Sequence, residues 1–130
     1  DIKINNEQKH ILEVEAMKTI ANVIGNEKLA DDILSLWYEY EGISHQHEKI
    51  ELTYESKIAH QLDKLEMIIQ ADEYERADST LDLQDFFNST QNSFEHVEIL
   101  EWVNELRSQR NQRKLTNITN TTTNISEESK

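Results

Sequence analysis

Residues that interrupt helices are almost absent from this sequence, which contains no proline and only two glycines, Gly25 and Gly42. The Leu, Glu, Gln, Lys and Ile residues that dominate it favour helices or tolerate them well. Long helices with few stops are therefore expected. We predict an all-α fold, and a chain of 130 residues is long enough for one modest domain with its own core.

Apolar residues recur every three to four positions in several stretches, which is the spacing that keeps one helix face on a core. The pattern predicts helices over residues 7–24, 27–41 and 55–76, and from about residue 94 onward. Asn5 or Asn6 is expected to cap the first helix, Gly25 to adopt the left-handed conformation past its end, and Gly42 to stop the second. Residues 42–54 are predicted as a loop that grades into a helix.

The last stretch of the chain differs in composition from the rest. Beyond Arg113 the sequence KLTNITNTTTNISEESK is rich in Asn, Thr and Ser and poor in core residues. Such a segment buries too little apolar surface to offset the entropy of ordering. The sequence therefore predicts a helical domain over residues 1–113 and a disordered tail over residues 114–130.

Charge and composition exclude several classes of function. The chain carries 13 Lys and Arg against 26 Asp and Glu, a formal charge of −13. This charge repels nucleic-acid polymers, and a phosphorylated ligand would need a metal ion or a local basic cluster to offset it. Cysteine is absent, which excludes disulfides and thiolate zinc sites. No apolar run approaches the ~20 residues that span a bilayer, so we expect a soluble, cytoplasmic protein with no membrane partner.

One carboxylate stands out in the predicted helix over residues 55–76. This helix is expected to bury Ile58, Ala59, Leu62, Met67 and Ile69. On a helical wheel, Asp63 falls within the core-facing arc that the last four of these residues mark. A buried carboxylate must be ion-paired, hydrogen-bonded or bound to a metal. Periodicity alone leaves open an internal partner, for example His10, Lys18 or Arg107, and also a metal ligand or catalytic acid.

Polar neighbours accompany Asp63 along the same predicted face. Glu66, Gln70 and Tyr74 fall inside the arc or at its edge. Four other polar residues are predicted to point away from the core: Lys57, Gln61, Lys64 and Glu75.

Several separated motifs occur in order along the chain. They read DIKINNEQKHILEVEAMKTI at the start, then LWYEYEG, then ESKIAHQLDKLEMIIQADEYE and finally LQDFFNSTQNSF. Together, from Asp1 to about Arg110, they resemble the C-terminal half of the HD-domain metal phosphohydrolases, specifically the small 5′-deoxynucleotidase group. The resemblance implies an HD-type helical bundle that hydrolyses nucleoside 5′-monophosphates, and a homodimer.

The resemblance also implies roles for individual residues. Asp63 matches the last Asp ligand of a divalent metal ion, which would be Mn, Co, Fe, Zn or Mg. Asp1 matches a catalytic or sugar-contacting acid, and Glu66, Gln70 and Tyr74 would support the ligand helix. The other metal ligands of the family, a His and a His-Asp pair, would precede Asp1, so we expect an N-terminally truncated chain that supplies only part of the site.

His60 departs from the family pattern, which commonly has Lys three residues before the Asp. An imidazole there would contact phosphate more weakly and with pH dependence. His60 and Asp63, three apart on a helix, could also reach one ion. Otherwise His60 is a partly exposed residue beside a carboxylate.

Other candidate residues have simpler interpretations. His45 and His47 with Glu41 or Glu48 form a rival surface metal group or a merely solvated loop. Trp37 and Tyr40 are expected to fill the core rather than stack on a base. His10 and His96 are expected to be surface residues.

A different class of function also remains open. The chain would then be a non-catalytic helical module for protein–protein interaction or dimerisation, with its exposed apolar surface as the interface.

Overall fold

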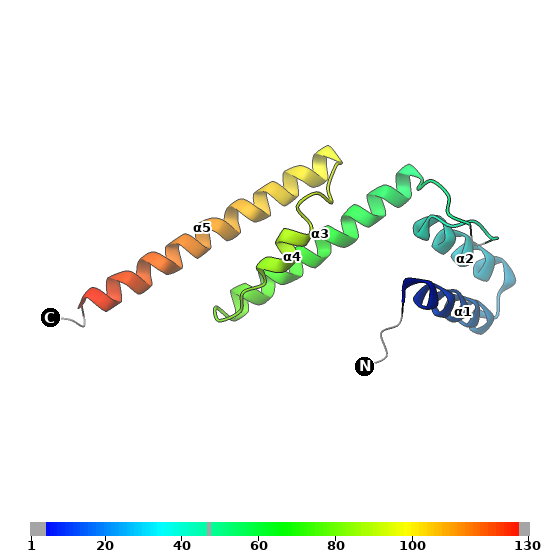
Figure 1. The fold of residues 1–130 in the computed structure, drawn as a ribbon, viewed down its shortest axis with the longest axis horizontal. Coiled ribbons are helices and arrows are strands. Elements are labelled where there is room, and N and C mark those ends of the chain that lie inside the picture. The colour runs from blue at the N-terminus through cyan, green and yellow to red at the C-terminus, as the bar shows by residue number, and fades with distance from the viewer. Residues whose placement is uncertain (1–4, 47, 128–130) are drawn as a thin grey trace. The chain divides into compact units, whose positions relative to one another are not determined.

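The computed structural model describes residues 5–46 and 48–127, with Asn6 and residues 119–127 described for their backbone alone. Five helices follow one another in this part of the chain (Figure 1): α1 (Asn6–Ile24), α2 (Glu27–Glu41), α3 (Tyr54–Ala77), α4 (Gln84–Ser89) and α5 (Val97–Glu127). The only β pairing among the described residues is an isolated bridge between Ile43 and Lys49. The predicted all-α fold is confirmed.

The chain forms two compact units, Asp1–Lys57 and Ile58–Lys130, which we call unit 1 and unit 2. The sequence had predicted one domain over residues 1–113. In unit 1, α1 and α2 pack on each other as a helical hairpin. Val14, Ala21, Tyr38 and Ile43 are buried there.

Local signals place the ends of α1 and α2 as predicted. Asn5 accepts a hydrogen bond from the backbone N–H of Gln8 at 2.8 Å, and its own N–H donates to the Gln8 side chain at 3.3 Å. Asn26 caps α2 by accepting from the N–H of Leu29 at 3.0 Å. Gly25 and Gly42 end the two helices in the left-handed conformation, with φ of 69° and 66°.

The described residues between α2 and α3 form a loop, as predicted, and α3 begins at Tyr54. The Ser44 N–H donates to the Glu48 carbonyl at 2.8 Å, and the Ile50 N–H donates to the Gly42 carbonyl at 2.8 Å. Thr53 then accepts from the N–H of Ser56 at 3.1 Å, which satisfies one free donor at the start of α3.

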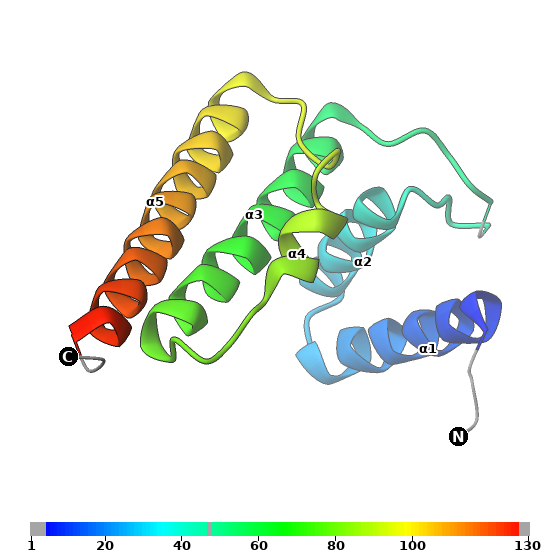
Figure 2. The ribbon, with the colours of Figure 1, turned by 60° about the vertical axis from the view of Figure 1, so that its left-hand side comes forward.

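Unit 2 has the larger core, formed where α3, α4 and α5 meet (Figure 2). Phe87 of α4 is 2% exposed and Ile68 of α3 is fully buried. The rest of this core consists of Leu65, Ala71, Phe94, Ile99 and Val103.

Helix α5 continues to Glu127 through the segment for which the sequence predicted a disordered tail. Leu115 and Ile118 in that segment are 65% and 64% exposed. Tertiary burial of these apolar side chains therefore contributes little there. The division of the chain at residue 113 stays a prediction.

Candidate functional site

The exposed side of α3 carries the predicted site residues. Asp63, Glu66, Gln70 and Tyr74 are three or four residues apart, so they follow one face of the helix, and all four side chains are exposed. His60 begins the same series and is half-buried. Asp1 lies outside the described residues.

The prediction that this face of α3 packs on a core is wrong for the described chain. Ala59, Leu62 and Ile69 on it are exposed, Leu62 by 44% and Ile69 by 40%. Ile58 and Met67 are partly buried as expected. The buried residues of α3 instead follow another face: Ser56, Gln61, Leu65, Ile68, Ala71, Asp72 and Glu75.

Gln61 was predicted to point away from the core, yet it is 8% exposed. Its side-chain oxygen accepts from the backbone N–H groups of Glu95 at 2.7 Å and His96 at 2.9 Å. These two donors lie just before the start of α5, where backbone N–H groups lack intrahelical partners. An amide from α3 thus satisfies the beginning of a helix that starts more than 30 residues later.

Glu75, also predicted to point outward, forms a buried ion pair with Arg110 of α5. Arg110 donates from Nε to Glu75 Oε2 at 2.6 Å and from Nη2 to Oε1 at 2.8 Å. The N–H of Leu83 donates to the same carboxylate at 2.7 Å. The hydrogen bonds from Arg110 hold the pKa of Glu75 down at about 2, against an ordinary value of 4.5.

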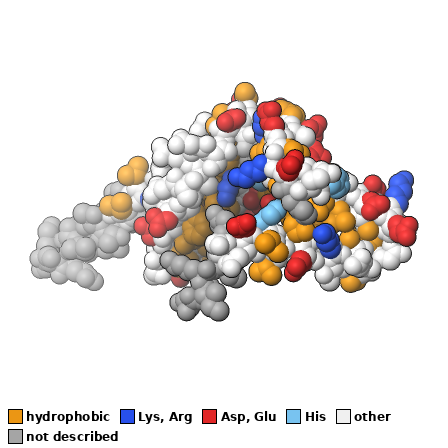
Figure 3. Space-filling view, turned by 45° about the vertical axis from the view of Figure 1, so that its right-hand side comes forward, with side chains coloured by type: hydrophobic (Ala, Val, Ile, Leu, Met, Phe, Trp, Pro, Cys, Tyr) orange, Lys and Arg blue, Asp and Glu red, His pale blue; other side chains and the backbone are white. Residues whose placement is uncertain are grey.

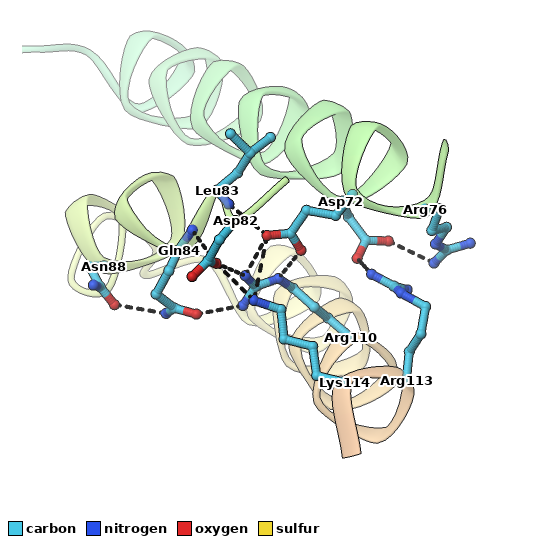
Figure 4. A network of polar contacts seen from close by, with 10 residues as sticks. Asp72, Arg76, Asp82, Leu83, Gln84, Asn88, Arg110, Arg113 and Lys114 are labelled. Carbon is cyan, nitrogen blue, oxygen red and sulfur yellow. Dashed lines mark hydrogen bonds and ion pairs between the residues drawn. The ribbon is translucent and has the colours of Figure 1, made fainter. Parts of the chain in front are cut away.

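The network extends to both sides of this pair (Figure 4). Asp72 is 1% exposed and contacts Arg76, at 2.7 Å, and Arg113. Arg110 also donates to Gln84 at 2.8 Å and lies over the Phe87 ring, 4.0 Å from its centre. These carboxylates are compensated by guanidinium groups, which makes the network a structural clamp between α3 and α5.

The sequence itself carries a signal for this clamp. Asp72 and Glu75 are three residues apart on α3, and Arg110 and Arg113 are three residues apart on α5. Two acids and two arginines at the same helical spacing match in register when the helices lie side by side. Internal ion pairs of the kind considered for Asp63 are thus formed by Asp72 and Glu75, which lie on the opposite face of α3.

One group of potential metal ligands occurs among the described residues. His10, Glu13 and Glu41 each offer a ligand atom, and these atoms lie within 4.8 Å of one another. The group lies wholly in unit 1 and does not include Asp63. His10 had been expected to be a surface residue, whereas the structure makes it half-buried.

The remaining candidates are placed as follows. The His45 ring meets the Tyr38 ring edge-on, with centroids 4.9 Å apart, while His47 lies outside the described residues. The rings of Trp37 and Tyr38 are 5.2 Å apart, and Trp37 and Tyr40 are half-buried. The prediction that Trp37 and Tyr40 fill the core is therefore met only in part.

Comparison with known proteins gives consistent matches. The sequence matches the HD domain family over residues 1–101. The 5′-deoxynucleotidase HDDC2 of Mus musculus is 42% identical over 108 residues, which cover 82% of this chain and 50% of that protein. HDDC2 of Homo sapiens is also 42% identical over 108 residues, covering 82% and 48%. The 5′-deoxynucleotidase YBR242W of Saccharomyces cerevisiae is 32% identical over 111 residues, covering 82% and 43%. The chain spans about half the length of the curated relatives that it matches.

Proposed function

This chain belongs to the HD domain family, and from that premise we propose that it forms part of a phosphohydrolase acting on deoxynucleoside 5′-monophosphates. The observation that carries the proposal is the match of most of the chain to relatives named as 5′-deoxynucleotidases. The acidic composition fits an enzyme that neutralises its phosphorylated substrate with a metal ion, since the chain carries a formal charge of −13.

Within this proposal Asp63 is a ligand of the divalent metal. A carboxylate on an exposed helix face fits one position of such a site, because hard oxygen donors suit divalent ions. One carboxylate does not hold an ion tightly, and among the described residues no group of three potential ligands includes Asp63. The described residues therefore fit part of the site only. We propose that its other ligands come from the half of the relatives' length that this chain does not span.

The neighbours of Asp63 have supporting roles in the proposal. Glu66, Gln70 and Tyr74 share its face of α3 and would position the segment that completes the site. His60 would contact the substrate phosphate, and Asp1 would act as an acid at the sugar or the attacking water. The metal itself, whether Mn, Co, Fe, Zn or Mg, would supply charge neutralisation and a more acidic water.

The test uses the complete protein that contains this chain, with dAMP as substrate and Mn²⁺ or Co²⁺ present. Asp63→Asn is expected to lower phosphate release by at least about a hundredfold, since a lost ligand should cost no less than the 10- to 100-fold lost with groups that only support one. Glu73→Gln provides the matched control, since Glu73 is an exposed acid of α3 that lies ten residues, or nearly three turns, from Asp63. Phosphate release that is equal in the two variants would exclude the role of Asp63.

A second candidate function is an interaction module, which exposed apolar residues favour. Val23 is 81% exposed and Leu36 is 65% exposed, and others on α1 are about half exposed. Figure 3 shows hydrophobic side chains at the surface of the molecule. A homodimer would bury such residues, and light scattering that gives the same dimer mass before and after chelation of metals would support this function. A monomer under both conditions would exclude it.

No helix in the part of the chain that the structure describes is both long and apolar enough to cross a membrane. A cytoplasmic location stays part of the proposal.

A further inference from the structure

The convergence of His10, Glu13 and Glu41 has no role in the reaction proposed above. We propose that these three residues bind a divalent first-row transition metal ion, with Zn²⁺ as the expected ion, at a site that joins α1 to α2. The inference concerns unit 1 alone and does not rest on the proposed function.

The helical hairpin explains why these residues meet. His10 and Glu13 are three apart on α1 and therefore point from the same face. Glu41 is the last residue of α2. Because α1 and α2 are joined by a two-residue connection and pack together, the early part of α1 lies beside the end of α2. Residues 28 or more positions apart thus present ligand atoms to one place.

The donor set indicates the class of ion. One imidazole nitrogen and two carboxylate oxygens suit Zn²⁺ and its neighbours in the first transition row, whereas an all-oxygen set would suit Mg²⁺ or Ca²⁺. Zn²⁺ with ligands at about 2.1 Å in a tetrahedron separates the ligand atoms by about 3.4 Å. The ligand atoms here already lie within 4.8 Å of one another. Small rotations of the glutamate side chains would close that difference.

The rotations of the two glutamate side chains should cost little free energy. Glu41 is exposed, so its side chain changes rotamer at low cost. Glu13 forms an ion pair with Lys9 at 3.4 Å, and the side chains of Glu13 and Lys9 are 40% and 69% exposed. Surface pairs of this kind contribute little to stability. An ion could therefore replace Lys9 as the partner of Glu13.

Two further observations favour a cation at this place. The C-terminus of a helix carries a partial negative charge, and the last turn of α2 contains no basic residue to compensate it. The His10 ring also stacks on Trp37 of α2, with centroids 6.3 Å apart and planes 13° from parallel. Trp37 is one turn before Glu41, so this contact holds the imidazole beside the end of α2.

The experiment measures Zn²⁺ binding to the 130-residue chain by equilibrium dialysis followed by elemental analysis. The unmodified chain is expected to bind one ion at this site. His10→Ala and Glu41→Gln should each weaken that binding by at least about tenfold, since loss of a direct ligand should cost no less than loss of a group that merely supports one. Glu27→Gln, at the other end of α2, and Asp63→Asn should leave it unchanged.

Thermal unfolding supplies the second measurement. Zn²⁺ should raise the melting temperature of the unmodified chain in a concentration-dependent manner, because an ion that binds only the folded state stabilises it. Glu41→Gln should remove that increase. Because Glu41 is exposed, circular dichroism should show the variant to be as helical as the unmodified chain.

Either of two results would overturn the proposal. One is unchanged Zn²⁺ affinity in both His10→Ala and Glu41→Gln. The other is loss of binding in Asp63→Asn alone, which would assign the ion to the site of the proposed enzyme instead.

Discussion

Two carboxylates on successive turns of α3 are buried because arginine side chains of α5 pair with them. Asp72 and Glu75 are both nearly inaccessible, and each is matched by an arginine of α5. Asp63, on another face of the same helix, is exposed. Periodicity placed Asp63 inward and Glu75 outward because it followed the arc of Ala59, Leu62 and Ile69, which the structure leaves exposed. The partner that allows Glu75 to be buried, Arg110, lies 35 residues further along the chain, beyond the reach of a local pattern.

Neutralising Glu75 should destabilise unit 2. We expect Glu75→Gln to lower the free energy of unfolding at pH 7 by about 3–5 kcal/mol, because the Arg110 charge would stay buried without its partner. Urea unfolding measures this change. Glu73→Gln, at an exposed position of the same helix, should stay within about 0.5 kcal/mol of the unmodified chain.

The same pair predicts a pH dependence. The pKa of Glu75 is lowered to about 2 from 4.5, so the stabilisation by its charged form is complete above about pH 4.5 and is lost as the pH falls toward 2. Unfolding curves across this range should therefore show a steeper loss of stability in the unmodified chain than in Glu75→Gln. Parallel losses in the two proteins would contradict the prediction.

At the scale of the element, the ends of α1 and α2 were predictable from the sequence, whereas the buried face of α3 was not. The ends of α1 and α2 depend on residues that act within one turn, such as Asn5, Gly25 and Gly42. The buried face of α3 depends on hydrogen bonds that Gln61 accepts from Glu95 and that Glu75 accepts from Arg110, both far along the chain. The residues that end a helix can be identified from a single sequence, because they act within one turn. Which face of a helix is buried depends on the elements that pack against it.

The two glycines provide a matched test of helix termination. At Gly25 an added Cβ would meet nothing within 4 Å, whereas at Gly42 it would lie 2.7 Å from Leu52 Cδ2. Gly25→Ala should therefore cost about 1–2 kcal/mol from its left-handed conformation alone. Gly42→Ala should cost more, because Leu52 must also move. Thermal unfolding compares the two, and equal losses would show that Leu52 yields freely.

At the scale of the whole molecule, family membership was the most secure prediction and the completeness of the site the least. Spacing correctly predicted that Asp63, Glu66, Gln70 and Tyr74 share a face, because helical geometry alone determines it. It did not predict the convergence of His10 with Glu41, which needs the register of the α1–α2 hairpin. The role of Asp63 as a metal ligand, and the supporting roles of Glu66, Gln70 and Tyr74, stay predictions.

Truncation tests where the ordered part of the chain ends. The ion pairs between α3 and α5 extend as far as Lys114, which lies 3.5 Å from Glu75. A chain that ends after residue 114 should keep its stability within about 0.5 kcal/mol. A chain that ends after residue 109 loses Arg110 and Arg113 and should lose about 3 kcal/mol or more. Urea unfolding of both would locate the boundary, and a large loss on ending after residue 114 would move it toward Glu127.

Helix α5 is held against α3 at two points. Just before its start, Gln61 of α3 accepts hydrogen bonds from the N–H groups of Glu95 and His96. Further along, Arg110 of α5 donates to Glu75 of α3. The number of residues between these two points therefore determines whether both contacts can form at once. One inserted residue would rotate everything after it by about 100° and carry the arginine off its carboxylate. Related sequences that keep both anchors should therefore tolerate substitutions in this interval far more readily than any change in its length.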